Sequence, residues 1–183
     1  MILICAFAGL AWGGLFGSIF MFDTSQNDIW FPGRIIAYVL LLIAPTLTFV
    51  PLSRALGTKW LAWIAAPGLA FFGYILAYMA PAPGQKWQDN LTPFICFLIG
   101  LFITVFCLFW PVLYLLGQKI FTNRKARYEI GRSIREALLV AAYIDAIFIM
   151  GAFHILGAFY ALALLALLVT AELFSLNRYL RTS

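Results

Sequence analysis

Two acidic residues lie inside apolar stretches, where a carboxylate could carry protons or cations. Asp145 is about nine residues into the apolar stretch 137–153, which is on the order of 13 Å along a helix. Inside a membrane, a charge at that depth is costly unless it is protonated, hydrated or paired. Two interpretations of Asp145 therefore stay open: a site for a proton, a cation or a polar ligand, and a carboxylic acid hydrogen-bonded to a nearby backbone group or tyrosine.

Glu172, the second such residue, lies near the end of the apolar stretch 156–176. A tight hairpin of the two stretches would bring Glu172 and Arg135 to a similar depth. We therefore expect the Glu172 carboxylate to pair with a cationic end residue such as Arg135. A ligand or ion site shared by Asp145 and Glu172 is the alternative, since their predicted depths differ by about one helical turn.

The sequence carries no motif of a cofactor or metal site. His154 is the only histidine and has no second His, Cys or acid at ligand spacing, so we expect an interfacial side chain and no metal. Phosphate-binding loops, Cys-x-x-Cys, His-Glu-x-x-His and Gly-x-Ser-x-Gly are all absent from the sequence. These absences favour a protein that is neither an enzyme nor a cofactor carrier. An intramembrane hydrolase using Ser18 and His154 is the least favoured alternative.

Gly9, Gly13 and Gly17 are spaced four apart near the start of the chain. Glycines at this spacing expose backbone along one helix face and let another helix approach closely. The face could pack against a helix of the same chain, or it could dock a partner subunit or a second copy.

The segment 118–136 holds six basic and two acidic residues, and its basic side chains could bind anionic lipid. The same charges could serve only as a topological retention signal. Ile130, Ile134 and Leu138 recur every four positions, which predicts a helical extension of the stretch 137–153. The anionic-lipid interpretation involves Lys119, Arg124, Lys125 and Arg127.

The composition fixes the kind of protein that positions these residues. The 183-residue chain is 64% hydrophobic and only 10% charged, with a mean hydropathy of +0.99. A water-soluble fold of this size could not bury so much apolar surface. The three cysteines lie inside apolar runs, which excludes a disulfide framework. The sequence therefore predicts an integral membrane protein that does not bind nucleic acid.

Six stretches are long and apolar enough, or nearly so, to cross a bilayer as helices. We predict an all-α, polytopic bundle forming one membrane domain over 1–183, in a bacterial inner membrane. No Lys or Arg precedes the first apolar core, so we expect a retained helix rather than a cleaved signal peptide. The predicted spans are about 1–22, 35–51, 60–80, 93–116, 137–153 and 156–176.

The basic residues predict that both termini are cytoplasmic. This orientation leaves only Arg34 and Lys86 of the twelve basic residues outside. Trp30 and Trp87 then fall at the outer boundary of the membrane, as an aromatic belt requires. The ten basic residues inside are Arg54, Lys59, Lys119, Arg124, Lys125, Arg127, Arg132, Arg135, Arg178 and Arg181.

The six-span size and topology resemble the substrate-binding components of energy-coupling-factor vitamin transporters. That family docks a partner through small residues spaced four apart in its first helix, which Gly9 and Gly13 match. Its polar substrate-binding loops have no counterpart here. The favoured function is a non-catalytic subunit or scaffold of a membrane complex. A small transporter or channel using Asp145 is the alternative.

Overall fold

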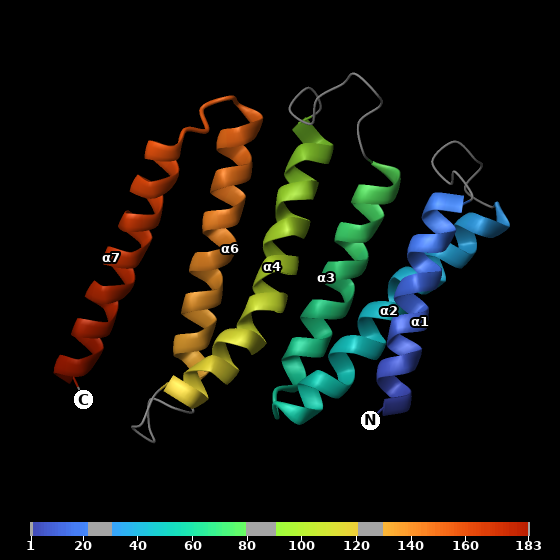
Figure 1. Ribbon diagram of the computed structural model, residues 1–183, viewed down its shortest axis with the longest axis horizontal. Helices are drawn as coiled ribbons and strands as arrows, with labels where there is room; N and C mark the ends of the chain where they lie inside the picture. The colour runs from blue at the N-terminus through green and yellow to red at the C-terminus, as the bar shows by residue number, and fades with distance from the viewer. Residues whose placement is uncertain (1, 22–30, 80–90, 121–129, 183) are drawn as a thin grey trace. The chain divides into compact units, whose positions relative to one another are not determined.

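The computed structural model describes residues 2–21, 31–79, 91–120 and 130–182. This part of the chain folds into six α-helices and contains no strand (Figure 1). The all-α prediction is therefore confirmed. The helices are α1 (Ile2–Met21), α2 (Pro32–Ala55), α3 (Lys59–Tyr78), α4 (Leu91–Ile120), α6 (Ile130–Ala152) and α7 (Ala158–Thr182).

Three helices, α2, α3 and α4, are long and apolar enough to cross a membrane. Two shorter apolar stretches, Ala6–Ile19 and Ala158–Glu172, lie in α1 and α7. Helix α6 carries Arg132, Arg135, Glu136 and Asp145 within its 23 residues, which lowers its hydropathy. The chain is therefore a multi-pass membrane protein whose long apolar helices contact lipid.

Helix α2 extends beyond the bounds predicted for its stretch, and its prolines do not end it. The stretch expected over 35–51 is a helix over Pro32–Ala55, which continues through Pro45 and ends four residues after Pro51. Each proline removes one backbone hydrogen bond, but nearby side chains and local adjustment make such breaks tolerable in membrane helices. The predicted extension of 137–153 is confirmed, because α6 begins at Ile130.

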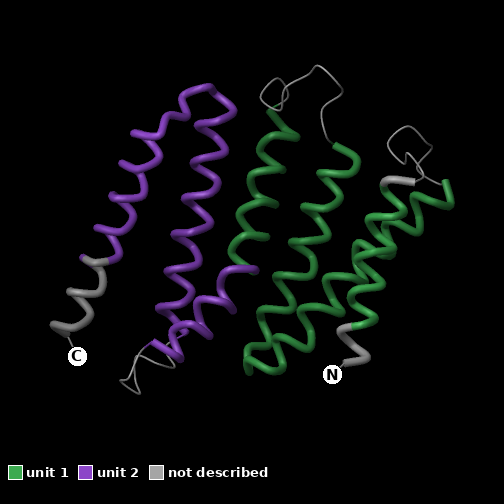
Figure 2. The backbone as a smooth tube through the Cα atoms, in the orientation of Figure 1, with its two compact units in different colours: residues 1–107 green, residues 108–183 purple. Residues whose placement is uncertain are grey.

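The chain divides into two compact units, Met1–Cys107 and Leu108–Ser183, with the boundary inside α4 (Figure 2). In the first unit, α2 packs against both α1 and α3. The Trp12 Nε1 donates a hydrogen bond to Thr48 Oγ1 at 3.1 Å, which joins α1 to α2.

Glycines bring the helices of the first unit close together. A Cβ added at Gly100 would lie 3.2 Å from the Cα of Phe72, and one added at Gly68 would overlap Ile103. At Gly100 the backbones of α3 and α4 therefore approach closely, whereas at Gly68 the neighbour is a side chain. Gly73 receives Leu41 of α2 in the same way, since an added Cβ would lie 2.5 Å from the leucine Cδ2.

The turn between α2 and α3 and the turn between α6 and α7 share one geometry. In each, a left-handed residue follows the helix, Gly57 at φ 70° and His154 at φ 57°. The next N–H reaches back into the last helical turn, from Thr58 to Ser53 O and from Ile155 to Met150 O. This is the Schellman arrangement that satisfies the last carbonyls of a helix. It produces the tight hairpin that was predicted around His154.

Candidate functional site

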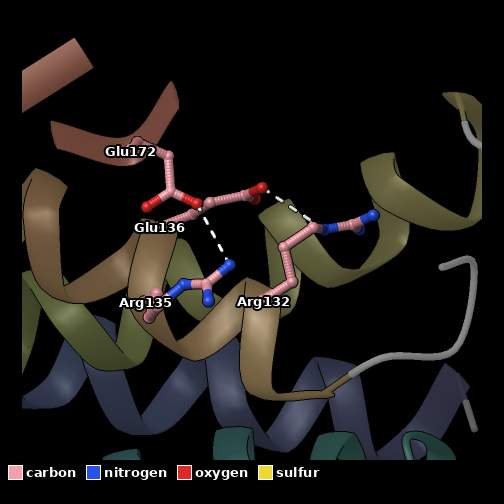
Figure 3. Close-up of polar contacts among 4 residues, drawn as sticks. All are labelled: Arg132, Arg135, Glu136 and Glu172. Atoms are coloured by element: carbon pink, nitrogen blue, oxygen red, sulfur yellow. Dashed lines mark hydrogen bonds and ion pairs between the residues drawn. The ribbon is translucent and has the colours of Figure 1, made fainter. Parts of the chain in front are cut away.

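The second unit contains a cluster of four charged residues at the start of α6 and near the end of the apolar part of α7 (Figure 3). Arg132 Nε lies 3.3 Å from Glu136 Oε1, one turn further along α6. Arg135 Nη2 lies 3.3 Å from Glu172 Oε1 of α7. The predicted pairing of Arg135 with Glu172 is confirmed, and this ion pair joins the two helices.

Arg132 is buried, with only 3% of its side chain exposed. Its guanidinium lies directly against Gly117 of α4, where any Cβ would overlap Nη2. A glycine at position 117 therefore makes room for the arginine, and Glu136 supplies a counter-charge. Such compensation is required because an unpaired buried charge is costly.

Glu136 lies at the edge of the predicted span 137–153, directly after Arg135 and one helical turn after Arg132. Burial raises the pKa of its carboxyl group. The positive charge of Arg132 opposes this shift, Glu172 adds to it, and Arg135 again opposes it. With two arginines and two glutamates, the cluster has no formal excess charge with which to attract a charged ligand. The cluster is therefore suited to a structural role, in which its ion pairs hold helices together.

Two apolar grooves lie between α6 and α7. One, of about 220 Å³, extends from Glu136 and Glu172 to Tyr143. The other, of about 510 Å³, extends from Tyr143 to the turn at Leu156 and Gly157. Tyr143 lines both grooves, and its hydroxyl donates a 3.4 Å hydrogen bond to the Ala161 carbonyl. These helices are thus joined by few contacts, with space for hydrocarbon beside them.

Helix α7 is exposed along most of its surface. Between Ala158 and Glu172 no residue is fully buried. The least exposed ones recur every three or four positions, which marks a single packed stripe. They are Ala161, Leu164, Leu168 and Glu172.

Asp145 lies in neither groove. Its Oδ1 atom is buried and has no hydrogen-bond partner among the described residues. Within the same part of the chain, no hydrogen bond or ion pair joins Asp145 to Glu172, which is paired with Arg135 instead. The shared site of these two acids therefore has no supporting contact, and a separate role for Asp145 stays a prediction.

The predicted glycine face of α1 is open. No described atom lies within 4 Å of a Cβ placed at Gly9, Gly13 or Gly17. The glycine of α1 that does approach another helix is Gly14, whose added Cβ would lie 3.4 Å from Leu40 Cδ1. Packing of the predicted face within the chain is thus not seen in the described residues, and partner docking stays a prediction.

Of the residues predicted to contact anionic lipid, Lys119 is exposed in the last turn of α4. Arg124, Lys125 and Arg127 lie outside the described residues. His154 occupies the turn between α6 and α7, as expected, and the described residues contain no group of three His, Cys, Asp or Glu side chains that could hold a metal.

Sequence reasoning missed the burial of Arg132 and the role of Gly117. It counted Arg132 only among the six basic residues of the segment 118–136. The spacing of Arg132 and Glu136, one helical turn apart, was the available signal. No sequence signal pointed to Gly117, since its partner lies on another helix.

No family model, no curated protein and no solved structure matches this chain.

The ion pair between Arg135 and Glu172 should be measurable by a double-mutant cycle. We expect Arg135→Gln and Glu172→Gln to be coupled by about 0.5–1 kcal/mol in unfolding free energy, the range for partly exposed pairs. Unfolding in detergent micelles, followed by circular dichroism, gives the four values. Lys119→Gln is the control and should be additive with Glu172→Gln. Strict additivity of the Arg135 and Glu172 variants would contradict a stabilising contact.

Proposed function

We propose that the protein is a non-catalytic subunit or scaffold of a membrane complex, and that α1 is the helix that docks its partner. The observation that carries this proposal is the open face formed by Gly9, Gly13 and Gly17. A partner subunit or a second copy would occupy it.

The positions of the buried residues of α1 support this proposal. The helix packs within the chain through Ala11, Leu15 and Ser18, which are buried. At about 100° per residue, the three glycines centre on nearly the opposite side of α1. One side of the helix is thus used inside the chain, and the other is available.

The side chains beside the glycines also suit a docking face. Leu10 and Phe16 are exposed and flank the glycine row on either side. In lipid there is no hydrophobic drive between helices, so association depends on close backbone approach and van der Waals contact. A glycine row with apolar edges offers both.

The proposed topology has six membrane-crossing helices, both termini in the cytoplasm and a bacterial inner membrane as the location. The distribution of ten of twelve basic residues supports the orientation. Helices α1, α6 and α7 complete the six, with the charged start of α6 at the cytoplasmic surface. Anionic lipids of that surface would contact the basic segment 118–136.

Cysteine labelling tests the topology. In a chain whose Cys5, Cys96 and Cys107 are replaced by alanine, we introduce Lys119→Cys and Ile155→Cys separately. A membrane-impermeant maleimide should label position 155 in intact cells and position 119 only after the membrane is opened. Labelling of both positions from the same side would rule out the six-span arrangement.

Substitution of Gly13 tests the docking face. Gly13→Leu should leave the monomer folded, because no described atom lies within 4 Å of a Cβ at this position. It should abolish recovery of a stoichiometric partner or second copy from native membranes, since leucine holds the helices apart. Co-purification in mild detergent, with mass determination of the particle, measures the effect.

Gly100→Leu is the matched control for that experiment. Its side chain would meet the Phe72 backbone, so it should destabilise the monomer by about 1–3 kcal/mol, as overpacking does. If Gly13→Leu leaves the particle mass and composition unchanged while Gly100→Leu destabilises the monomer, the docking role of the glycine face is wrong.

A second candidate function is transport of a proton or cation through Asp145. The observation in its favour is the buried Oδ1 atom without a hydrogen-bond partner among the described residues. Ionisable groups inside membrane helices commonly serve ion pathways. No Lys or Arg of the predicted spans lies at a comparable depth to neutralise it.

Two substitutions separate transport from a structural role. Asp145→Asn keeps the size and a hydrogen-bond donor but cannot ionise, and Asp145→Leu removes both the hydrogen-bonding group and the ionisable group. If Asp145 carries ions, the wild-type protein in vesicles should show pH- or cation-driven flux that both variants lack, although Asp145→Asn folds normally. Absence of any wild-type flux above that of Asp145→Asn would eliminate the transport function.

A further inference from the structure

Another groove, larger than the two beside α7, lies in the first unit between α2 and α3. Its volume is about 550 Å³. Along most of its length its walls are apolar, with Leu42 and Val50 on α2 and Ala62, Ala66 and Pro67 on α3. From Leu42 to Arg54 the groove follows α2 for about 18 Å, at 1.5 Å per residue. This is a little more than half the hydrocarbon core, and thus about the thickness of one leaflet.

One end of the groove is cationic. Arg54 is in the last turn of α2 and Lys59 is the first residue of α3, so the two flank the turn of Leu56, Gly57 and Thr58. Both side chains are exposed and both line the groove. The two cations therefore lie where the apolar groove reaches the edge of the hairpin.

Neither cation is neutralised within the described part of the chain. No ion pair there involves Arg54 or Lys59, whereas Arg132 and Arg135 each have a glutamate. The whole segment 32–78 contains no aspartate or glutamate. The negative dipole end of α2 and the positive dipole end of α3 meet at this turn and offset each other, so the two side chains set the local charge.

Trp63 places this end of the groove near the membrane surface. It lines the groove and is 81% exposed, one turn into α3 from Lys59. Tryptophan is enriched where hydrocarbon meets head groups, because its ring is apolar and its N–H is polar. The cations, one helical turn nearer the helix end, would then lie at the level of lipid phosphates.

We propose that the groove between α2 and α3 is a binding site for one anionic phospholipid. An acyl chain lies between the helices, along Leu42, Val50 and Ala66, and the phosphate rests between Arg54 and Lys59. The site is distinct from the basic segment 118–136, where only surface attraction is expected. In this site the apolar groove binds the acyl chain and the two uncompensated charges bind the phosphate, so both parts of the site fit the same amphiphilic molecule.

The charge pattern favours this occupant over a zwitterionic lipid or a partner helix. A zwitterionic head group carries its own cation and gains less from Arg54 and Lys59. An apolar helix of a partner would fill the groove but leave both cations unpaired. A lipid with an anionic phosphate satisfies the apolar wall and the charges together.

Quenching of Trp63 by brominated lipids tests the site. The protein is reconstituted in nanodiscs containing brominated phosphatidylglycerol in a phosphatidylcholine background, or brominated phosphatidylcholine in an unbrominated background of the same kind. Since the chain has six tryptophans, the Trp63 signal is the difference between each protein and the same protein with Trp63→Phe. We expect half-maximal quenching at an at least tenfold lower mole fraction of the anionic lipid.

Substitutions of Arg54 and Lys59 test whether these residues cause the preference for the anionic lipid. Arg54→Gln and Lys59→Gln should each weaken it about fivefold, and the double variant should remove it. Arg54→Lys keeps the charge and should retain most of the preference. Ala62→Phe fills the groove and should reduce quenching by both lipids. Lys119→Gln, an exposed cation outside the groove, is the matched control and should change nothing.

Only variants whose helix content and unfolding midpoint match those of the wild-type protein are compared. If the glutamine variants do not fold, Arg54→Lys is the folded variant for the comparison. Equal quenching of wild-type Trp63 by the two lipids would overturn the proposal. So would a preference that survives the double variant, or one that Lys119→Gln removes, because each would indicate general surface attraction rather than this groove.

Discussion

The cost of an unpaired charge or an unsatisfied backbone group in hydrocarbon governs this structure. Backbone groups are satisfied inside helices, and the two helix ends at Gly57 and His154 close onto their own carbonyls. The described arginines and lysines follow the same constraint, because each one either pairs or lies near a helix end, and Asp145 inside α6 is the exception. Arg132 is the clearest case, because its buried guanidinium pairs with Glu136 and fits only because Gly117 has no side chain.

Close packing in the first unit follows from the same environment. Without a hydrophobic drive between helices in lipid, association rests on van der Waals contact, which increases as backbones approach. Gly68 and Gly100 provide that approach between α3 and α4, and Gly73 provides it between α2 and α3. The regularly spaced glycines of α1 make no such contact within the described chain, which is why they are the natural place to look for another molecule.

Much of the fold is predictable from sequence because it depends on local properties. Apolar length predicted the helices, the four-residue recurrence at Ile130 and Ile134 predicted the start of α6, and equal depth in a hairpin predicted the contact of Arg135 with Glu172. The role of Gly117 could not be predicted, because it depends on which side chain of another helix arrives there. Spacing alone favoured Gly13 over Gly100, because Gly100 has no glycine four positions away, yet among the described residues it is Gly100 that contacts another helix.

The two groups of cations in the described chain differ in what surrounds them, and this difference bears on function. At the start of α6, Arg132 and Arg135 are matched by two glutamates, and burial raises the pKa of one of these. A balanced, partly buried set of this kind holds helices together and leaves little charge for anything else. At the turn between α2 and α3, Arg54 and Lys59 stand beside an apolar groove in a segment without a single acid. Basic residues that serve only to retain a loop in the cytoplasm need no groove beside them. The uncompensated pair of Arg54 and Lys59 is therefore better explained by a ligand that binds in the groove.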